Sequence, residues 1–123
     1  MSDWKTPLRL VEQLDKKGNI HEKGVKKLVS AVAEASELGD KLGCAEFIAF
    51  ATSAVRSAPN SEAVLDEVEK QTGVRLQILS GVEEAQLTFL SARRWYGWSA
   101  GRITNLDIGG GSLELSTGTD EHP

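Results

Sequence analysis

The chain has 123 residues, with 18 acidic and 14 basic side chains, a formal net charge of −4 and 40% hydrophobic residues. A chain of this size and apolar content can bury a core without cross-links, and its single cysteine, Cys44, excludes a disulfide framework and a multi-cysteine metal site. No apolar run approaches the roughly 20 residues that span a bilayer, and no lysine and arginine cluster offers a basic face for nucleic acid. The composition indicates a cytoplasmic globular protein with no membrane and no nucleic-acid partner.

The first half of the chain predicts a strand, a helix and a second strand. Residues 6–11 are expected to form an edge strand. Apolar residues recur at helical spacing across residues 22–42, and Gly43 is expected to end that helix. Residues 46–51 are mostly apolar and do not alternate, which is typical of a strand buried on both faces in a parallel sheet.

The next elements continue this alternation of helices and strands. Residues 52–60 are rich in small and polar side chains, which predicts a turn, and Asn60 is a good N-cap for a helix that ends at Gly73. Residues 74–79 predict the following strand. The order favours a parallel α/β core with right-handed crossovers.

A third helix is expected to begin directly after this strand. Ser80 and Glu83 form a capping box, in which each side chain binds the backbone N–H of the other residue. The buried stripe of this helix is expected to comprise Val82, Ala85, Phe89, Ala92 and Tyr96. Residues 93–98 (RRWYGW) are interpreted as the helix end, with core aromatics and with cations that the helix dipole favours.

The last segment predicts a β-hairpin. Residues 102–108 and 112–117 are strand candidates on either side of a triglycine turn. Since side chains alternate along a strand, Asp107 and Glu114 lie on one side, and the other side carries Leu106, Ile108, Leu113 and Leu115. An isolated hairpin is marginally stable, so this one must pack against another element.

Residues 107–114 (DIGGGSLE) carry the clearest chemical pattern in the chain. Three glycines let the backbone approach a phosphate and aim successive amide groups at its oxygens. Magnesium usually takes one or two protein carboxylates together with water and phosphate oxygens, and Asp107 and Glu114 can supply the carboxylates. The alternative is a glycine turn with two solvated acids.

Glu84 is the candidate general base. Neighbouring positions on a helix point about 100° apart, so if Glu83 returns to the cap, Glu84 faces elsewhere. A carboxylate near a helix N-terminus tends to be ionised, and an ionised carboxylate can orient and deprotonate a water. The alternative is simply a second acidic residue in the first turn.

Arg56 is the candidate phosphate ligand. It follows the carboxyl end of a predicted buried strand, where ligands of open α/β sheets usually bind. A guanidinium binds phosphate in a fixed geometry and offsets charge during phosphoryl transfer. The alternative is a solvated loop cation.

Three segments in succession resemble the Ppx/GppA family of exopolyphosphatases and guanosine pentaphosphate phosphohydrolases. They are residues 51–56 (ATSAVR) with Asn60, residues 80–85 (SGVEEA), and residues 107–112 (DIGGGS) with Glu114. Residues 93–98 are similar to the same stretch of actinobacterial exopolyphosphatases, and the likeness extends through most of the chain.

The resemblance implies an α/β fold of the actin-like, ribonuclease-H-like phosphatase type, incomplete at both ends. Residues 1–100 would be most of a first domain and residues 101–123 the opening hairpin of a second. The implied activity is release of terminal phosphate from inorganic polyphosphate or guanosine pentaphosphate, with Mg²⁺ as cofactor. The implied roles are Glu84 as catalytic base, Asp107 and Glu114 as magnesium ligands, Gly109, Gly110, Gly111 and Ser112 as a phosphate cradle, and Arg56 as a phosphate ligand.

The chain also departs from the family pattern. Nothing in it matches the Asp-x-Gly-Ser-Asn phosphate loop with which the family opens. Gln86 stands where the family usually has arginine, and Leu113 where it usually has threonine. We therefore expect the 123 residues alone to be weakly active or inactive.

Two other functions are compatible with the sequence. One is a non-catalytic module that either binds phosphate or forms a strand-swapped homodimer through its unpaired strand edges. The other is a sugar-type or acetate-type kinase, which is weaker because nothing resembles a nucleotide-base site.

Overall fold

The computed structural model describes residues 4–109 and 111–119. The chain forms two compact units, Met1–Ile78 and Leu79–Pro123, each of which is described by itself. No helix in the described ranges is long and apolar enough to cross a membrane.

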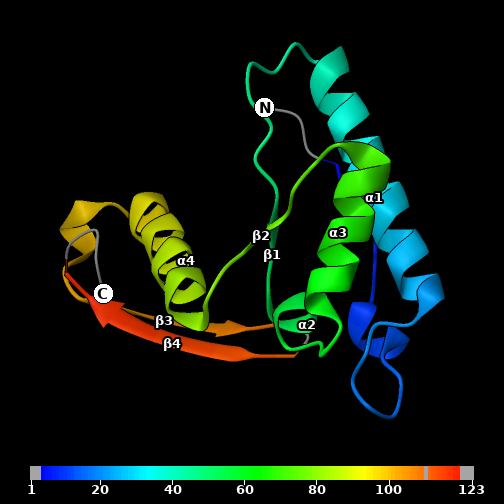
Figure 1. Cartoon of the computed structure of the whole chain (residues 1–123). Helices are drawn as coiled ribbons and strands as arrows, with labels where there is room; N and C mark the ends of the chain where they lie inside the picture. Colours follow the sequence, from blue (N-terminus) through cyan, green and yellow to red (C-terminus); the bar gives the residue numbers. More distant parts are fainter. Residues whose placement is uncertain (1–3, 110, 120–123) are drawn as a thin grey trace. The chain divides into compact units, whose positions relative to one another are not determined.

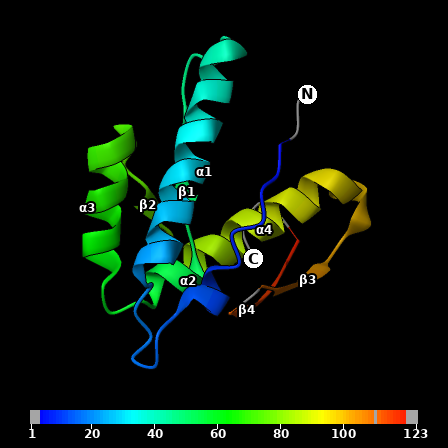
Figure 2. The ribbon, with the colours of Figure 1, turned by 90° about the vertical axis from the view of Figure 1, so that its right-hand side faces the viewer.

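The first unit is built from helices and a pair of short parallel strands. Its elements are η1 (Leu10–Gln13), α1 (Glu22–Lys41), β1 (Phe50–Ala51), α2 (Ser53–Arg56), α3 (Ser61–Thr72) and β2 (Gln77–Ile78). Helices α1 and α3 pack side by side (Figures 1 and 2). Strands β1 and β2 pair in parallel, Phe50 opposite Gln77 and Ala51 opposite Ile78, which confirms the predicted parallel α/β pairing.

The core of this unit joins the apolar faces of α1 and α3 to the strand pair. Its buried members are Ile20, Leu28, Val32, Ala51, Val55, Ala58, Val64, Leu65, Val68 and Leu76. Both long helices end at the predicted glycines: Gly43 has φ 69° and Gly73 has φ 72°. A glycine takes this left-handed conformation without the steric cost of a Cβ.

Strand β1 is shorter than predicted, and the expectation of burial on both faces was wrong. Ile48 and Phe50 are 54% and 48% exposed, whereas Ala51 is 7% exposed. The segment alternates between outward and inward residues because the core of this unit lies on one face of the strand pair. Its apolar composition alone does not distinguish a covered face from an uncovered one.

The edge strand predicted over residues 6–11 was also wrong. Residues 4–9 have no regular structure, Arg9 is left-handed at φ 50°, and η1 follows. A strand is stable only where a neighbour binds its backbone groups. The pairing that does form is a single antiparallel bridge between Leu14 and Ile20.

Asn60 occupies the predicted N-cap of α3 but makes no capping hydrogen bond. Its side-chain Oδ1 instead accepts from the N–H of Ile20 at 2.9 Å, and its Nδ2 donates to the carbonyl of Ile20 at 2.9 Å. One amide therefore satisfies both backbone groups of a buried residue 40 positions earlier.

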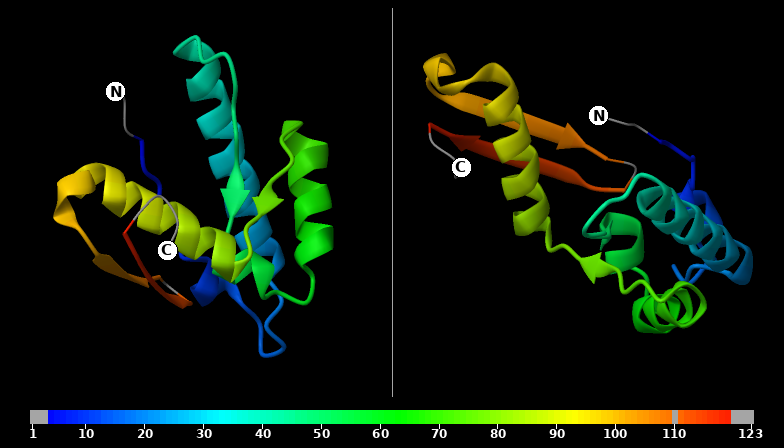
Figure 3. Two further views of the ribbon diagram at one scale, coloured as in Figure 1. Left: turned by 90° about the vertical axis from the view of Figure 1, so that its left-hand side faces the viewer. Right: turned by 90° about the horizontal axis from the view of Figure 1, so that it is seen from above.

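The second unit is a helix on a hairpin. Its elements are α4 (Gly81–Tyr96), η2 (Trp98–Ala100), β3 (Ile103–Ile108) and β4 (Leu113–Gly118). Strands β3 and β4 pair antiparallel from Ile103 opposite Gly118 to Ile108 opposite Leu113, and α4 packs across both strands (Figure 3). The predicted hairpin and its packing against another element are confirmed.

The predicted capping box at the start of α4 is also confirmed. The N–H of Glu83 donates to Ser80 Oγ at 3.2 Å, and the N–H of Ser80 donates to Glu83 Oε2 at 2.8 Å. These hydrogen bonds, the one from the Ser80 backbone most of all, lower the pKa of Glu83.

The two faces of the hairpin carry the predicted side chains. The apolar face comprises Leu106, Ile108, Leu113 and Leu115, which are 54–71% exposed. On the opposite face, Glu114 and Ser116 are buried, and Asn105 binds Thr88 of α4. Helix α4 therefore packs on the polar face.

The predicted buried stripe of α4 was correct only in part. Phe89 is fully buried, but Val82 and Tyr96 are 67% and 68% exposed. Arg93, predicted as a cation that the dipole favours at the helix end, is fully buried, whereas Trp95, predicted as a core aromatic, is 84% exposed. Because the hairpin face beneath the helix is polar, a donor-rich side chain takes the place that periodicity assigned to aromatic residues.

Candidate phosphate and metal site

Two of the predicted site residues lie directly opposite one another in the hairpin. Asp107 of β3 pairs with Glu114 of β4. Both lie on the face toward α4, and Glu114 is only 9% exposed. Directly opposite residues have Cβ atoms about 4.5–5.5 Å apart, and like charges in such a pair repel, so a shared cation would stabilise both.

The donor set of this pair fits magnesium. Mg²⁺ binds through one or two carboxylates and keeps its remaining positions for water and phosphate oxygens. Within residues 4–109 and 111–119, no group of three or more His, Cys, Asp or Glu side chains is arranged to hold a metal. Asp107 and Glu114 would hold the ion as a pair of protein ligands.

The turn beside this pair supplies polar groups for an anion. The N–H of Gly109 donates to the carbonyl of Ser112 at 3.0 Å, which closes the turn. The hydroxyl of Ser112 is buried and has no hydrogen-bond partner in the part of the chain that the structure describes. Gly111 is exposed, and Gly110 lies outside the described residues.

The direction of α4 over β3 follows from two contacts. Asn105 Nδ2 donates to Thr88 Oγ1 at 3.3 Å in the middle of the helix. Near the helix C-terminus, Arg93 Nη2 donates to the carbonyls of Gly101 at 2.6 Å and Gly118 at 3.0 Å, at the far end of the hairpin. Helix α4 therefore runs antiparallel to β3, and its N-terminus lies toward the glycine turn.

This direction places Glu84 at the level of Asp107. Glu84 is four residues before Thr88, about 6 Å along the helix and on the same side. Asp107 is two residues after Asn105, about 6.6 Å along the strand and on the same face. Both steps lead toward the glycine turn, and the Thr88 hydroxyl also donates to the Glu84 carbonyl at 3.1 Å. The base candidate and the metal pair thus share one end of this unit.

Arg56 lies in the first unit. It is the last residue of α2, and it is half buried. Helix α2 is a single helical turn, whereas the sequence predicted an irregular turn in this segment. The role of Arg56 as a phosphate ligand stays a prediction.

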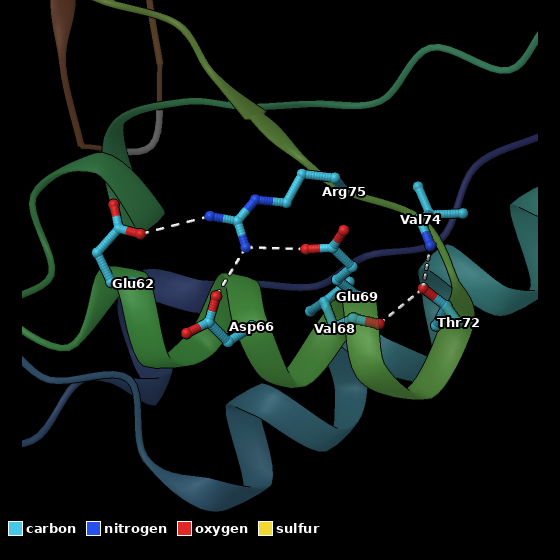
Figure 4. Close-up of polar contacts among 7 residues, drawn as sticks. All are labelled: Glu62, Asp66, Val68, Glu69, Thr72, Val74 and Arg75. Atoms are coloured by element: carbon cyan, nitrogen blue, oxygen red, sulfur yellow. Dashed lines mark hydrogen bonds and ion pairs between the residues drawn. The ribbon is translucent and has the colours of Figure 1, made fainter.

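Arg75 is a second arginine, which the sequence analysis did not single out. Its Nη1 lies 2.7 Å from Asp66 and 3.0 Å from Glu69, and its Nη2 lies 3.4 Å from Glu62 (Figure 4). These carboxylates, Asp66 first, raise the pKa of Arg75. Their spacing of four and three residues along α3 was the available signal. Three carboxylates of α3 already bind the guanidinium of Arg75. Arg75 therefore links α3 to the segment just before β2, and it is not a candidate phosphate ligand.

Comparison with known proteins places this arrangement in a family. A model of the Ppx/GppA phosphatase family matches residues 1–123. The chain belongs to the Ppx/GppA phosphatase family. It is 60% identical to Exopolyphosphatase 1 of Mycobacterium leprae over 123 residues, which is 100% of this chain and 36% of that protein.

Solved structures of the Ppx/GppA family show the same fold. An exopolyphosphatase from Cytophaga hutchinsonii superposes with a TM-score of 0.78 at 28% identity, over 84% of this chain and 33% of that one. The Aquifex aeolicus Ppx/GppA protein gives a TM-score of 0.75 at 24% identity, over 89% of this chain and 36% of that one. The predicted α/β fold of the actin-like, ribonuclease-H-like class is confirmed. The division into domains at residue 100 stays a prediction.

Proposed function

We propose that this chain contributes the catalytic base and the metal pair to a phosphoanhydride hydrolase that releases terminal phosphate from inorganic polyphosphate. Guanosine pentaphosphate is the alternative substrate with the same chemistry. The observations that support the proposal are the pairing of Asp107 with Glu114 and the hydrogen bond of Asn105 to Thr88, from which we infer that Glu84 lies at the turn end of the second unit. The names of the relatives, exopolyphosphatases at up to 60% identity, support the substrate class.

In the proposed reaction, Glu84 orients a water and accepts its proton as the water attacks the terminal phosphorus. It lies in the first turn of α4, at the positive end of the helix dipole. Glu83 is engaged by the cap and is therefore not the base. A water held in line with the leaving group needs little further activation, since phosphoryl transfer depends mainly on positioning and electrostatics.

The turn is the proposed phosphate cradle. The Ser112 hydroxyl and the backbone amides of Gly109, Gly110 and Gly111 would bind the phosphate oxygens. Arg56, in the first unit, stays a predicted phosphate ligand that would offset the charge. Mg²⁺, held by Asp107 and Glu114, would neutralise charge on the phosphate oxygens.

Two adjacent glutamates provide a matched test of this proposal. The protein for the test is a chimera in which residues 1–123 replace the matching segment of the Mycobacterium leprae relative, and the readout is phosphate release from polyphosphate with Mg²⁺. Glu84→Gln is expected to lower kcat by about 10²–10⁴-fold, the usual contribution of a general base. Glu83→Gln is expected to leave kcat nearly unchanged, because glutamine also completes a capping box. A folded chimera without Mg²⁺-dependent release, or full release by Glu84→Gln, would refute the proposal.

A second copy of the chain is also proposed as a partner. The apolar face of the hairpin, with Ile108 at 71% and Leu115 at 66% exposure, is the supporting observation. Light scattering of the 123-residue chain is expected to give the mass of a dimer, and a monomer at all concentrations would contradict this. The exposed free thiol of Cys44 is the observation that favours the proposed cytoplasmic location.

A further inference from the structure

The second unit contains a buried cation that the proposed reaction does not use. Arg93 is 0% exposed, one of the few buried charged residues among those described. A buried charge is costly unless hydrogen bonds and favourable electrostatics offset its lost hydration. The contacts of Arg93 therefore indicate its role.

Arg93 joins the C-terminal end of α4 to the open end of the hairpin, where β3 begins and β4 ends. Its Nη2 donates to the carbonyls of Gly101, just before β3, and Gly118, at the end of β4. Its Nη1 donates to the carbonyl of Gly97 at 3.4 Å. The guanidinium also lies 5.7 Å from the ring centre of Phe89 and 5.9 Å from that of Trp98. A single planar group thus fixes the helix end, the entry to β3 and the exit from β4.

Two side chains of α4 make hydrogen bonds that join the helix to the hairpin or to the segment just before it. Arg93 is one, and Thr88, bound by Asn105, is the other. One contact lets a helix pivot, whereas two contacts fix its direction. The direction of α4 determines where Glu84 lies relative to Asp107.

We propose that Arg93 is a positioning residue, which fixes the tilt of α4 on the hairpin and so holds the base Glu84 in register with the metal pair. This inference rests on the proposed function. Without Arg93, Thr88 and Asn105 remain as a pivot, and Glu84 lies about 6 Å from that pivot along the helix. A tilt of about 10° then moves Glu84 by about 1 Å, a displacement that can cost about 10²-fold in rate.

Arg93→Met removes the hydrogen bonds and the charge while keeping an unbranched side chain. In the chimera described above, it is expected to lower kcat about 10-fold to 100-fold, with KM changed less than about threefold, because substrate groups are left in place. The matched control is Arg94→Met, since Arg94 is its exposed neighbour and is expected to leave kcat unchanged. Arg93→Lys keeps the charge but cannot reach two carbonyls in the same plane, and it is expected to fall between the wild type and Arg93→Met.

A double-mutant cycle with Glu84→Gln separates positioning from a general effect on folding. If Arg93 acts through Glu84, Arg93→Met lowers kcat in the wild-type background and has little further effect in the Glu84→Gln background. Where Arg93→Met lowers the yield of folded protein, Arg93→Lys provides the same cycle.

Three results would overturn the inference: unchanged kcat in both Arg93 variants, an effect confined to KM, or an equal loss in both backgrounds. In each of these cases the response of kcat to Glu84→Gln alone still tests the proposed function separately. A folded chimera with no hydrolysis before any substitution removes the proposed function and this inference with it.

Discussion

The amide of Asn60 allows the contribution of one side chain to folding to be worked out in detail. Its two hydrogen bonds to Ile20 complete a local ladder, in which Asp15 and His21 donate to the carbonyls of Asn19 and Gln13. Ile20 is 2% exposed, so water cannot readily replace the amide in Asn60→Ala. The substitution leaves a buried N–H and a buried C=O without partners.

Each orphaned group costs about 1–3 kcal/mol, so Asn60→Ala is expected to lower the free energy of unfolding by about 2–6 kcal/mol. The total stability of a unit the size of Met1–Ile78 is about 4–12 kcal/mol, so this is a large fraction. At about 4–8 °C per kcal/mol for a domain of this size, Tm should fall by about 8 °C or more.

The measurement is urea and thermal unfolding of the 123-residue chain, followed by circular dichroism. Lys70→Ala, an exposed substitution in the same helix α3, is the matched control and should change stability by less than about 0.5 kcal/mol. Asn60→Asp keeps the acceptor for the Ile20 N–H but loses the donor to the Ile20 carbonyl. Its free energy of unfolding should therefore fall less at acid pH, where the carboxyl is protonated and can donate. If Asn60→Ala were as stable as Lys70→Ala, the reasoning about Ile20 would be refuted.

Two further predictions concern surface electrostatics. Because its capping hydrogen bonds lower the pKa of Glu83 below the ordinary 4.5, the ionised side chain stabilises the fold above that pH, and this stabilisation is lost as pH falls through the lowered value. Glu83→Ala should therefore destabilise the chain at neutral pH, and the urea midpoints of variant and wild type should converge at acid pH; a difference that grows on acidification would contradict this. Arg75→Ala should lower Tm in low salt and much less in high salt, because its three carboxylate partners are exposed to screening ions. Equal losses at both salt concentrations would show that packing, and not charge, is responsible.

Elements that depend on local patterns could be predicted from the sequence. The capping box of Ser80 and Glu83 needs residues only three positions apart, and Gly43 and Gly73 end their helices through their own backbone freedom. The opposition of Asp107 and Glu114 follows from the alternation of side chains in a hairpin whose turn is marked by three glycines. These predictions succeeded because each interaction is contained within one element or one turn.

Features that depend on distant residues were missed. Asn60 has the composition of a cap, but a backbone 40 residues away competes successfully for its amide. Arg93 was predicted only as a cation that the helix dipole favours, yet the carbonyls of Gly101 and Gly118 converge on its position. Periodicity also cannot say which face of a hairpin a helix covers, so the polar face beneath α4 and the exposure of Tyr96 could not be foreseen.

The most direct test of the central claim is the response of the second unit to a paramagnetic divalent cation. Mn²⁺, which takes the same oxygen ligands as Mg²⁺, would be titrated into the isotopically labelled 123-residue chain while backbone amide signals are recorded. We predict that broadening begins at Asp107, Glu114 and the first turn of α4 around Glu84, spares Gly101 and Gly118 at the other end of the hairpin, and is abolished by Asp107→Asn combined with Glu114→Gln. Broadening that begins at the far end, or that survives the double substitution unchanged, would contradict the claim that the base and the metal pair share one site.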